Sequence, residues 1–488
     1  MDSDKSLKQK IISGVFWQGL ERVGSQGISF LISIVLARLL TPNEFGVLAI
    51  MMVFVAICGV FIDSGFSTAL IQKKDVDDVD CSSVFFINIV MAAVFYAFLF
   101  AGAPLIADFY DSPAITAYLR ILALVLIIRS FSLVQGTLLT KKMLFYLNFR
   151  ITWCALLISG GIGTTMAYLG FGVWALITQQ LICAAVTCLM QWYLVKWRPK
   201  MLFDFLRVRE MFRFGWKLFC SSLLDTVYND IYAILIGKLF NLTTLSFYNR
   251  GRSIPALGMG IVNSTIGSVI FPAFAGLQDD RGRMRRLAEK SLKSIMFLVI
   301  PVLTLLLILA NPLVTLLLTE KWLPCVPFLQ LSCLIFLFWP LHTLNLQIIT
   351  ACGRSDVFLG LEIIKKLQLA VVIFVTYRYG VMAMVWGLVF AGPLSFIENS
   401  WFNRKLIGYS SLQQFMVILP LLLVAAGAGG ISAAALQALQ SPWLKLAAGG
   451  SLFSVLYLVG AWLVGYIPPD MITILKQRSL EWRKTQSL

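Results

Sequence analysis

LARLLTPNEFG, residues 36–46, indicates an internal repeat, because a related stretch, IGKLFNLTTLS, recurs at residues 236–246. In both stretches a basic residue, Arg38 or Lys238, lies between the end of one apolar run and the start of the next. The interval of 200 residues holds six apolar runs, and an even number of crossings returns a chain to the same side of a membrane. The sequence therefore predicts a parallel repeat of two six-helix lobes.

The composition is that of a membrane protein. Of the 488 residues, 59% are apolar and 13% are charged, and about 20 apolar residues are needed to cross the hydrocarbon core as a helix. We predict an all-α polytopic membrane protein with about 14 transmembrane helices, in which two C-terminal helices follow the two lobes. The predicted spans are 12–37, 46–71, 82–106, 116–139, 147–169, 173–195, 214–239, 243–275, 291–311, 324–350, 356–379, 381–402, 413–436 and 443–466.

The predicted domain boundaries follow the longest loop, which is expected between Lys196 and Lys217. The N-terminal lobe is predicted at residues 1–200 and the C-terminal lobe at 201–404. Residues 405–488 then hold the last two helices and a basic tail. No short apolar core with a small-residue cleavage site follows the N-terminus, so a removable signal peptide is not expected.

Basic residues predict the orientation of the helices. Of the 40 lysines and arginines, 28 lie in segments that begin with the N-terminus and alternate with loops that together hold five, and the remaining seven lie within helices. Positive charge marks the cytoplasmic side of a membrane protein, so both termini are predicted to be cytoplasmic. The net charge of +16 is explained by this asymmetry, and we expect no nucleic-acid partner.

The first predicted helix contains two adjacent charges in QGLERVGSQG, residues 18–27. At 100° per residue its polar side chains fall within an arc of about 140°, and the seventh helix carries Ser221, Ser222, Asp225, Thr226 and Asn229 at positions 200 residues on. The stripe predicts a cavity-lining face, with Glu21 as the counter-charge of Arg22. The alternative is an interfacial helix at 5–26, which would leave only about 21 Å of helix before Leu40.

Seven basic residues lie inside predicted spans and more than three residues from either end, where charge is costly and marks a functional site by default. We predict that they bind the anionic head group of a substrate, because guanidinium and ammonium groups match phosphate oxygens. A structural alternative remains for six of them: ion pairing for Arg22, interfacial anchoring for the two arginines beside Pro255, and snorkelling for the other three. Arg129 is expected near the midplane, where snorkelling is difficult. The predicted anion-binding residues are Arg22, Arg120, Arg129, Arg250, Arg252, Lys365 and Lys366.

Acids in the spans are fewer, and two roles remain open for them. A carboxylate at membrane depth can bind Na⁺ or a proton and so couple an ion gradient to transport, or it can neutralise a nearby base. The predicted ion-coupling or charge-pairing residues are Glu21, Asp63, Asp225, Asp230 and Glu398. The single histidine, His342, is expected to be a packed, hydrogen-bonded residue.

Catalytic and metal sites are not expected. The sequence lacks the phosphate-binding motif G-x-x-x-x-G-K-[ST], and its predicted outer loops are short. Nine cysteines are scattered singly without a CxxC pair, which predicts neither a metal centre nor a disulfide framework. An enzyme would have to use outer-loop acids such as Asp108, Asp111 or Glu320. We therefore expect no enzyme activity and no cofactor other than a Na⁺ or H⁺ gradient.

LARLLTPNEFGVLAI (36–50), followed by FIDSGFSTALIQKKDVD (61–77), resembles the opening of the polysaccharide transporter branch of the multidrug/oligosaccharidyl-lipid/polysaccharide exporter superfamily, the Wzx-type O-antigen flippases. The resemblance implies two six-helix lobes around a basic cavity and two further helices. It also implies a bacterial inner-membrane protein that flips an undecaprenyl-pyrophosphate-linked oligosaccharide by alternating access for lipopolysaccharide or exopolysaccharide synthesis.

The implied partners are a lipid-linked glycan, membrane lipids and other polysaccharide assembly proteins. Two alternative functions remain. An ion-coupled multidrug or cation antiporter of the same superfamily would be expected to have an acid-dominated cavity. A membrane polymerase or glycosyltransferase would depend on the outer-loop acids named above.

Overall fold

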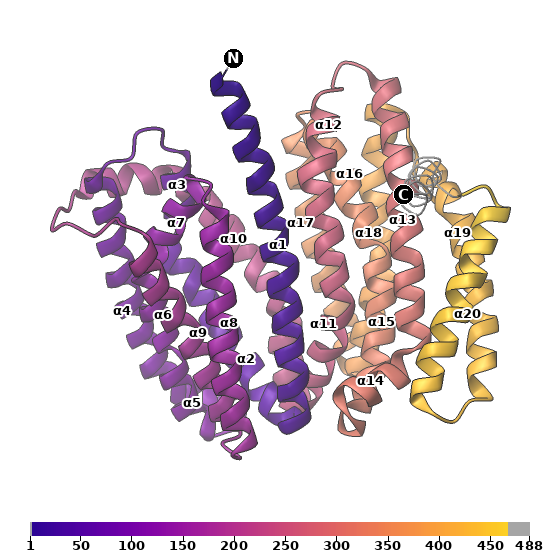
Figure 1. Cartoon of the computed structure of the whole chain (residues 1–488), viewed down its shortest axis with the longest axis horizontal. Coiled ribbons are helices and arrows are strands. Elements are labelled where there is room, and N and C mark those ends of the chain that lie inside the picture. The colour runs from indigo at the N-terminus through magenta and orange to yellow at the C-terminus, as the bar shows by residue number, and fades with distance from the viewer. Residues whose placement is uncertain (1, 467–488) are drawn as a thin grey trace, which may run out of the picture. The chain divides into compact units, whose positions relative to one another are not determined.

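The computed structural model describes residues 2–466, and contacts divide the chain into two units, Met1–Asn249 and Arg250–Leu488. Every regular element in the described residues is helical (Figure 1). This confirms the predicted all-α fold. The predicted lobe boundaries at residues 200 and 404 stay predictions, and the predicted basic tail lies outside the described residues.

The first unit consists of ten helices and the start of an eleventh, and in it the long helices run side by side (Figure 1). Their bounds are α1 (Asp2–Leu39), α2 (Pro42–Asp63), α3 (Phe66–Gln72), α4 (Asp78–Phe109), α5 (Ala114–Leu122), α6 (Leu124–Ser130), α7 (Leu133–Lys141), α8 (Phe145–Tyr168), α9 (Val173–Leu194), α10 (Phe205–Leu239) and α11 (Leu242–Thr265).

Local sequence explains where these helices start and stop. Thr41 and Glu44 form a capping box at the start of α2, and Pro42 occupies the first turn, where a missing N–H costs nothing. Asp204 caps α10 by accepting from the amides of Leu206 and Arg207. The loop predicted to extend to residue 217 is therefore shorter than expected, because α10 already begins at Phe205.

The repeat is visible in the helix ends and in a direct contact. α1 ends at Leu39 and α10 at Leu239, 200 residues apart. The first turns of the helices that follow, α2 and α11, touch: the Thr243 hydroxyl donates to Asn43 Oδ1 at 3.5 Å, again 200 residues apart. At Gly46 an added Cβ would lie 1.8 Å from the carbonyl oxygen of Leu242, so only glycine fits there. The stretch at residues 36–46 is therefore part of a backbone contact between the two repeats.

The second predicted span is broken into α2 and α3. Ser64 and Gly65 have φ of 45° and 77°, in the left-handed region that favours glycine. A Cβ at Gly65 would approach the carbonyl oxygen of Gly215 to 2.5 Å, so α10 passes directly against the break. The break leaves Asp63 at the end of α2, facing the start of α3.

The second unit contains the rest of α11 and all later elements (Figure 1). Their bounds are η1 (Ile266–Ile270), α12 (Phe271–Ala275), α13 (Arg281–Ile308), α14 (Ala310–Leu318), η2 (Glu320–Cys325), α15 (Val326–Leu337), α16 (Trp339–Ala351), α17 (Ser355–Thr376), η3 (Tyr377–Tyr379), α18 (Val381–Ile407), α19 (Ser411–Gln437) and α20 (Pro442–Leu463).

The last two helices share the core of the second unit. α19 packs mainly on α13 and α20, and the Tyr457 hydroxyl donates to the carbonyl of Phe297 at 3.0 Å. Three buried amides join α16, α18 and α19: Asn345 donates to Gln414 at 2.9 Å, and Asn403 donates to Asn345 at 2.6 Å. Because buried amides must be satisfied, this network fixes how the three helices pack.

Ten helices in the described residues are long and apolar enough to cross a membrane, and eleven if α5, α6 and α7, which bend by 44°, form one span. The three remaining predicted spans correspond to α10, α11 and α17. These helices carry Asp225 and Asp230, Arg250 and Arg252, and Lys365 and Lys366, respectively. The charges that make them candidates for function also make them less apolar than the others.

Candidate functional site

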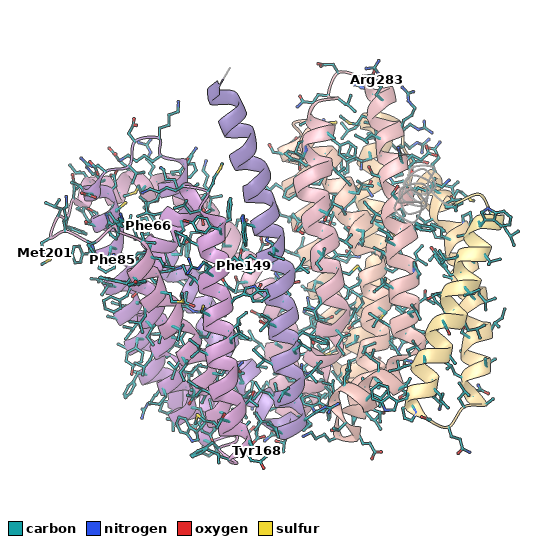
Figure 2. All side chains as sticks on the ribbon, viewed as in Figure 1. Phe66, Phe85, Phe149, Tyr168, Met201 and Arg283 are labelled. Atoms are coloured by element: carbon teal, nitrogen blue, oxygen red, sulfur yellow. The ribbon has the colours of Figure 1, made fainter. Side chains whose placement is uncertain are left out.

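In the first unit, Glu21 on α1 contacts α8. The Thr152 hydroxyl donates to Glu21 Oε1 at 3.2 Å, and Phe149, one turn before it, lies beside α1 with its ring 5.3 Å from that of Trp17 (Figure 2). Gly24 permits this packing, because a Cβ there would lie 2.5 Å from the Trp153 ring. The polar stripe of α1 therefore faces α8 at Glu21.

Arg22 is exposed. It forms no ion pair with any described side chain of residues 17–466. Its neighbour Glu21, the predicted counter-charge, accepts a hydrogen bond from Thr152. The guanidinium thus remains available to an anion. Its role as a ligand stays a prediction.

Asp63 belongs to a hydrogen-bonded chain that joins α2, α3 and α7. Its Oδ1 accepts from the hydroxyl of Ser67 at 2.5 Å and from the Ser67 amide at 3.2 Å, and Thr137 donates to Ser67 at 3.1 Å. In the second unit Asn263 accepts from Thr343 on α16 at 3.0 Å. The two repeats therefore keep a polar contact at equivalent positions, with a carboxylate in one and an amide in the other.

In the second unit, α16, α17 and α18 bring polar side chains together within the span. Lys365 Nζ lies 2.5 Å from Glu362 Oε1, Ser395 donates to Gln368 at 3.0 Å, and His342 Nδ1 lies 3.3 Å from Asn399 Nδ2. The hydrogen bond of His342 confirms the expectation of a packed histidine.

Glu398 lies on α18 among these groups. Its Oε2 is buried and finds no hydrogen-bond donor among the described residues. A buried carboxylate oxygen without a donor is costly as an anion. Protonation or a bound cation would remove that cost, so Glu398 is a chemically suitable position for a coupling ion.

Arg250 is buried on α11, where its guanidinium lies 5.1 Å from the centre of the Trp322 ring. Gly251 makes this possible, because a Cβ there would meet the amide nitrogen of Leu329 at 2.6 Å. α11 therefore approaches α15 closely, and Arg250 packs against Trp322. Arg252, two residues on, is half-buried.

The two arginines of the fourth span lie in different surroundings. Arg120 donates from Nε to the backbone carbonyl of Phe100 at 3.1 Å, and its guanidinium lies 4.3 Å from the centre of the Phe100 ring. Arg129 is exposed at the last turn of α6. Arg120 thus fastens α5 to α4, and Arg129 is accessible to a ligand.

Three other predicted residues differ in exposure. Asp225 is exposed on α10, while Asp230 and Lys366 are half-buried. Of the outer-loop acids, Asp111 pairs with Lys238 at 3.2 Å.

An ion network lies at one end of the first unit, which we call the basic end because Lys73 and Arg207 lie there. Asp80 is fully buried and binds Lys73 at 2.6 Å and Arg207 at 3.3 Å. Arg207 also pairs with Asp77 at 2.5 Å, and this hydrogen bond lowers the pKa of Asp77 to about 2. The network ties the start of α10 to the start of α4 and has the character of a structural lock.

Sequence reasoning missed the uncharged partners of these groups, among them Thr152, Ser67, Thr137, Thr343 and Asn399. Their signal in the sequence is weak, because single hydroxyl and amide residues are common in membrane helices. Of the predicted site residues, the structure places Lys365 on α17 and Glu398 on α18 close enough to interact electrostatically. Glu362, which was not predicted as a site residue, pairs with Lys365.

The described residues offer two kinds of chemistry. Exposed guanidiniums at Arg22 and Arg129 can bind phosphate. The unpaired oxygen of Glu398 can accept a proton or a small cation. These are functions of binding and ion exchange.

Comparison with known proteins gives relatives along most of the chain. A family of polysaccharide biosynthesis proteins matches residues 35–327. The lipopolysaccharide biosynthesis protein WzxC of Escherichia coli (strain K12) is 24% identical over 421 residues, 85% of each chain. The succinoglycan biosynthesis transport protein ExoT of Rhizobium meliloti (strain 1021) is 26% identical over 328 residues, 66% of each chain.

Two solved structures share the fold. The lipid II flippase MurJ in an inward closed conformation superimposes with a TM-score of 0.70 at 14% identity, covering 92% of this chain and 97% of MurJ. An inward-facing multidrug resistance transporter of the MATE family superimposes with a TM-score of 0.60 at 16% identity, covering 80% of this chain and 98% of the transporter.

Proposed function

Since this chain belongs to the polysaccharide biosynthesis protein family, we propose that it is a flippase that moves a lipid-linked oligosaccharide across a membrane for the synthesis of a surface polysaccharide. The observation that carries this function is the relationship to WzxC over 85% of both chains. The fold shared with the lipid II flippase MurJ supports it. The protein is a transporter and not an enzyme.

The anionic head group of the substrate meets the embedded bases. Arg22 and Arg129 are exposed and are the first contacts for a pyrophosphate, because a planar guanidinium can bind two phosphate oxygens at once. Arg252, Lys365 and Lys366 are half-buried and provide further positive charge. Arg250 and Arg120 contribute charge at a distance, since both stack on aromatic rings.

Transport is driven by a Na⁺ or H⁺ gradient, and Glu398 is its binding group. The argument is the buried Oε2 that lacks a donor. Asp63, Asp225, Asp230 and Glu21 are the remaining acids at membrane depth. Of these, Asp63 and Glu21 already accept hydrogen bonds from hydroxyl groups.

The proposed location is the bacterial inner membrane, which the bacterial relatives WzxC and ExoT support. The distribution of lysine and arginine favours cytoplasmic termini. Its partners are the lipid-linked glycan, the surrounding lipids and other polysaccharide assembly proteins.

An ion-coupled drug antiporter is the second candidate, favoured only by the fold shared with the MATE transporter. Embedded bases outnumber embedded acids in this chain, seven to six with Glu362 counted, and this balance favours an anionic substrate over a cationic drug.

A deletion strain tests the function. Loss of the gene should stop the export of surface polysaccharide and cause a lipid-linked oligosaccharide to accumulate at the cytoplasmic face of the membrane. The wild-type gene and Lys74→Gln, which changes an exposed base in the loop between α3 and α4, should restore export. Arg22→Gln and Arg129→Gln should reduce it at normal protein levels. Normal export by both variants would exclude these arginines, and a deletion strain that exports normally while losing drug efflux would establish the antiporter.

A further inference from the structure

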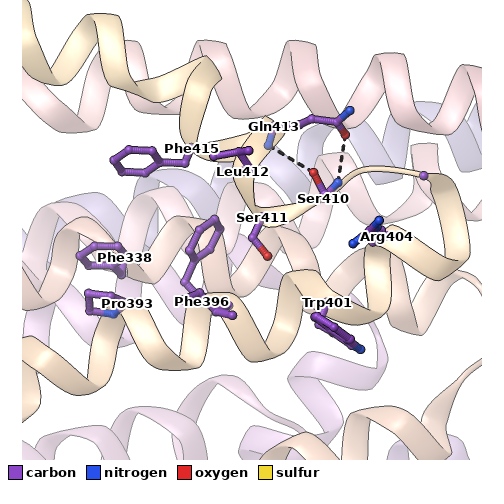
Figure 3. Close-up of a pocket in the computed structure, with 12 residues that line it drawn as sticks. Phe338, Pro393, Phe396, Trp401, Arg404, Ser410, Ser411, Leu412, Gln413 and Phe415 are labelled. Atoms are coloured by element: carbon purple, nitrogen blue, oxygen red, sulfur yellow. Dashed lines mark hydrogen bonds between the residues drawn. The ribbon is translucent and has the colours of Figure 1, made fainter.

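A groove lies between α18 and α19 in the second unit, with a volume of about 970 Å³. Its wall is mostly apolar, and Figure 3 shows side chains from both helices and Phe338 around it. The lining residues are Phe338, Pro393, Phe396, Ile397, Trp401, Arg404, Gly408, Ser410, Ser411, Leu412, Gln413 and Phe415.

The groove exists because of how α19 is held. α18 ends at Gly408, whose φ of 69° turns the chain, and α19 starts three residues later, with Ser410 and Gln413 forming a capping box (Figure 3). α19 then packs mainly on α13 and α20 and leaves α18 along its length. The groove therefore opens because α19 packs on α13 and α20, on the side that faces away from α18. Helices form its walls.

The groove opens on a surface that faces lipid. Trp401 is 55% exposed and Leu412 is 64% exposed, in a chain whose exposed helix faces are apolar. A volume near 1,000 Å³ is at the upper end of the range for sites that enclose small ligands. In a bilayer, hydrocarbon chains are the molecules that reach such a surface.

Charge marks one end of the groove. Arg404 lines it near the turn to α19, is exposed and forms no ion pair within residues 17–466. No acidic residue lines the groove. Arg404 lies in the last turn of α18, at the end of the helix where the head groups of one leaflet are found.

We propose that this groove is a binding site for an anionic glycerophospholipid, with its acyl chains along Phe396, Ile397 and Leu412 and its phosphate at Arg404. Basic pockets between transmembrane helices on the cytoplasmic side bind anionic head groups by the same combination of charge and apolar contact. None of the seven embedded bases lines the groove, so the lipid of the bilayer is assigned to it and the transported substrate is not. A lipid bound there contacts both α18 and α19.

Native mass spectrometry of the purified full chain in detergent tests the head-group contact. Phosphatidylglycerol should bind more tightly than phosphatidylcholine of the same chain length. Arg404→Gln should weaken the binding of phosphatidylglycerol about fivefold, which is the effect expected from removing one cation near an anionic lipid. The control Lys405→Gln, on an exposed neighbour outside the groove, should leave it unchanged. Equal binding by the wild type and Arg404→Gln, or equal loss in both variants, would overturn the proposal.

A second pair of variants tests the apolar part. Leu412→Trp places a larger ring in the groove and should reduce the binding of both lipids, whereas Met416→Trp, one turn further along α19 and outside the lining, should not. Thermal unfolding in detergent verifies that the variants fold. Undecaprenyl phosphate at equal concentration should leave phosphatidylglycerol bound. If it displaces the phospholipid, the groove belongs to the tail of the transported substrate and the assignment to a bilayer lipid is wrong.

Discussion

Lys365 and Glu362 form an ion pair one helical turn apart on α17, with Nζ 2.5 Å from Oε1. The side chains are 14% and 29% exposed. The pair gives each charge a partner within a span, where a lone charge would be costly. It leaves Glu398, on the neighbouring helix α18, without a hydrogen bond to its buried oxygen.

Breaking this pair should cost stability. Lys365→Met leaves the Glu362 carboxylate without its partner, and we expect the free energy of unfolding to fall by roughly 2 kcal/mol. The double variant Glu362→Gln/Lys365→Met should lose less, because no charge is then stranded. Thermal unfolding in detergent measures both, with Lys405→Met, at an exposed lysine of α18, as the control. A double variant less stable than Lys365→Met would contradict this account of the pair.

Neutralising Glu398 should separate transport from folding. Glu398→Gln removes the unpaired charge while keeping the shape of the side chain, so the melting temperature should equal or exceed that of the wild type. Export of polysaccharide should fall about tenfold, because an amide cannot exchange a proton or bind a cation as a carboxylate does. Glu398→Asp serves as the charge-retaining control. Full export by Glu398→Gln would remove this residue from ion coupling.

The hydrogen bond between Thr152 and Glu21 should hold α1 on α8. Thr152→Val keeps the volume of the side chain and removes the hydroxyl, and we expect a loss of about 1 kcal/mol in stability. Thr165→Val on the same helix is the comparison, since the Thr165 hydroxyl bonds only its own helix, at the carbonyl of Gly161. Equal stability of the two variants, measured by thermal unfolding, would show that the contact with α1 contributes nothing.

Gly46 should tolerate no side chain. Gly46→Ala places a methyl group 1.8 Å from the carbonyl oxygen of Leu242, and relief would require the backbone to shift. We expect a loss of about 3 kcal/mol or failure to fold, seen as low yield of monodisperse protein. Gly59→Ala is a matched control on the same helix, with no atom within 4 Å of the added group. It should fold normally, and a normal yield of Gly46→Ala would refute the close contact of the two repeats.

The ion network at the basic end predicts a pH dependence. Arg207 lowers the pKa of Asp77 to about 2 in the folded protein, below the value of about 3.9 in an unfolded chain. The stabilisation is therefore complete above about pH 4 and disappears as the pH falls through about 2. Melting temperatures in detergent between pH 5 and pH 2.5 should fall less steeply for Asp77→Asn than for the wild type. Asp75→Asn, in the same loop, should behave like the wild type, and parallel curves for all three would contradict the prediction.

Much of the fold could be predicted because its causes are local in the chain. Apolar runs of sufficient length, capping residues such as Thr41 and Glu44, and the 200-residue repeat all act within short windows. The three charged helices α10, α11 and α17 were also predicted as spans. Boundaries were less certain, as the early start of α10 at Phe205 shows.

The sequence by itself determined an all-helical membrane protein, its repeat, its basic end and the short set of charges placed at membrane depth, because hydropathy and charge are properties of each residue in order. Tertiary structure alone decided what those charges touch. Gly251 lets α11 approach α15 and so places Arg250 on Trp322, and the packing of α19 on α13 opens the groove at Arg404. Such contacts depend on the rotation and separation of helices far apart in the chain, which no local pattern specifies.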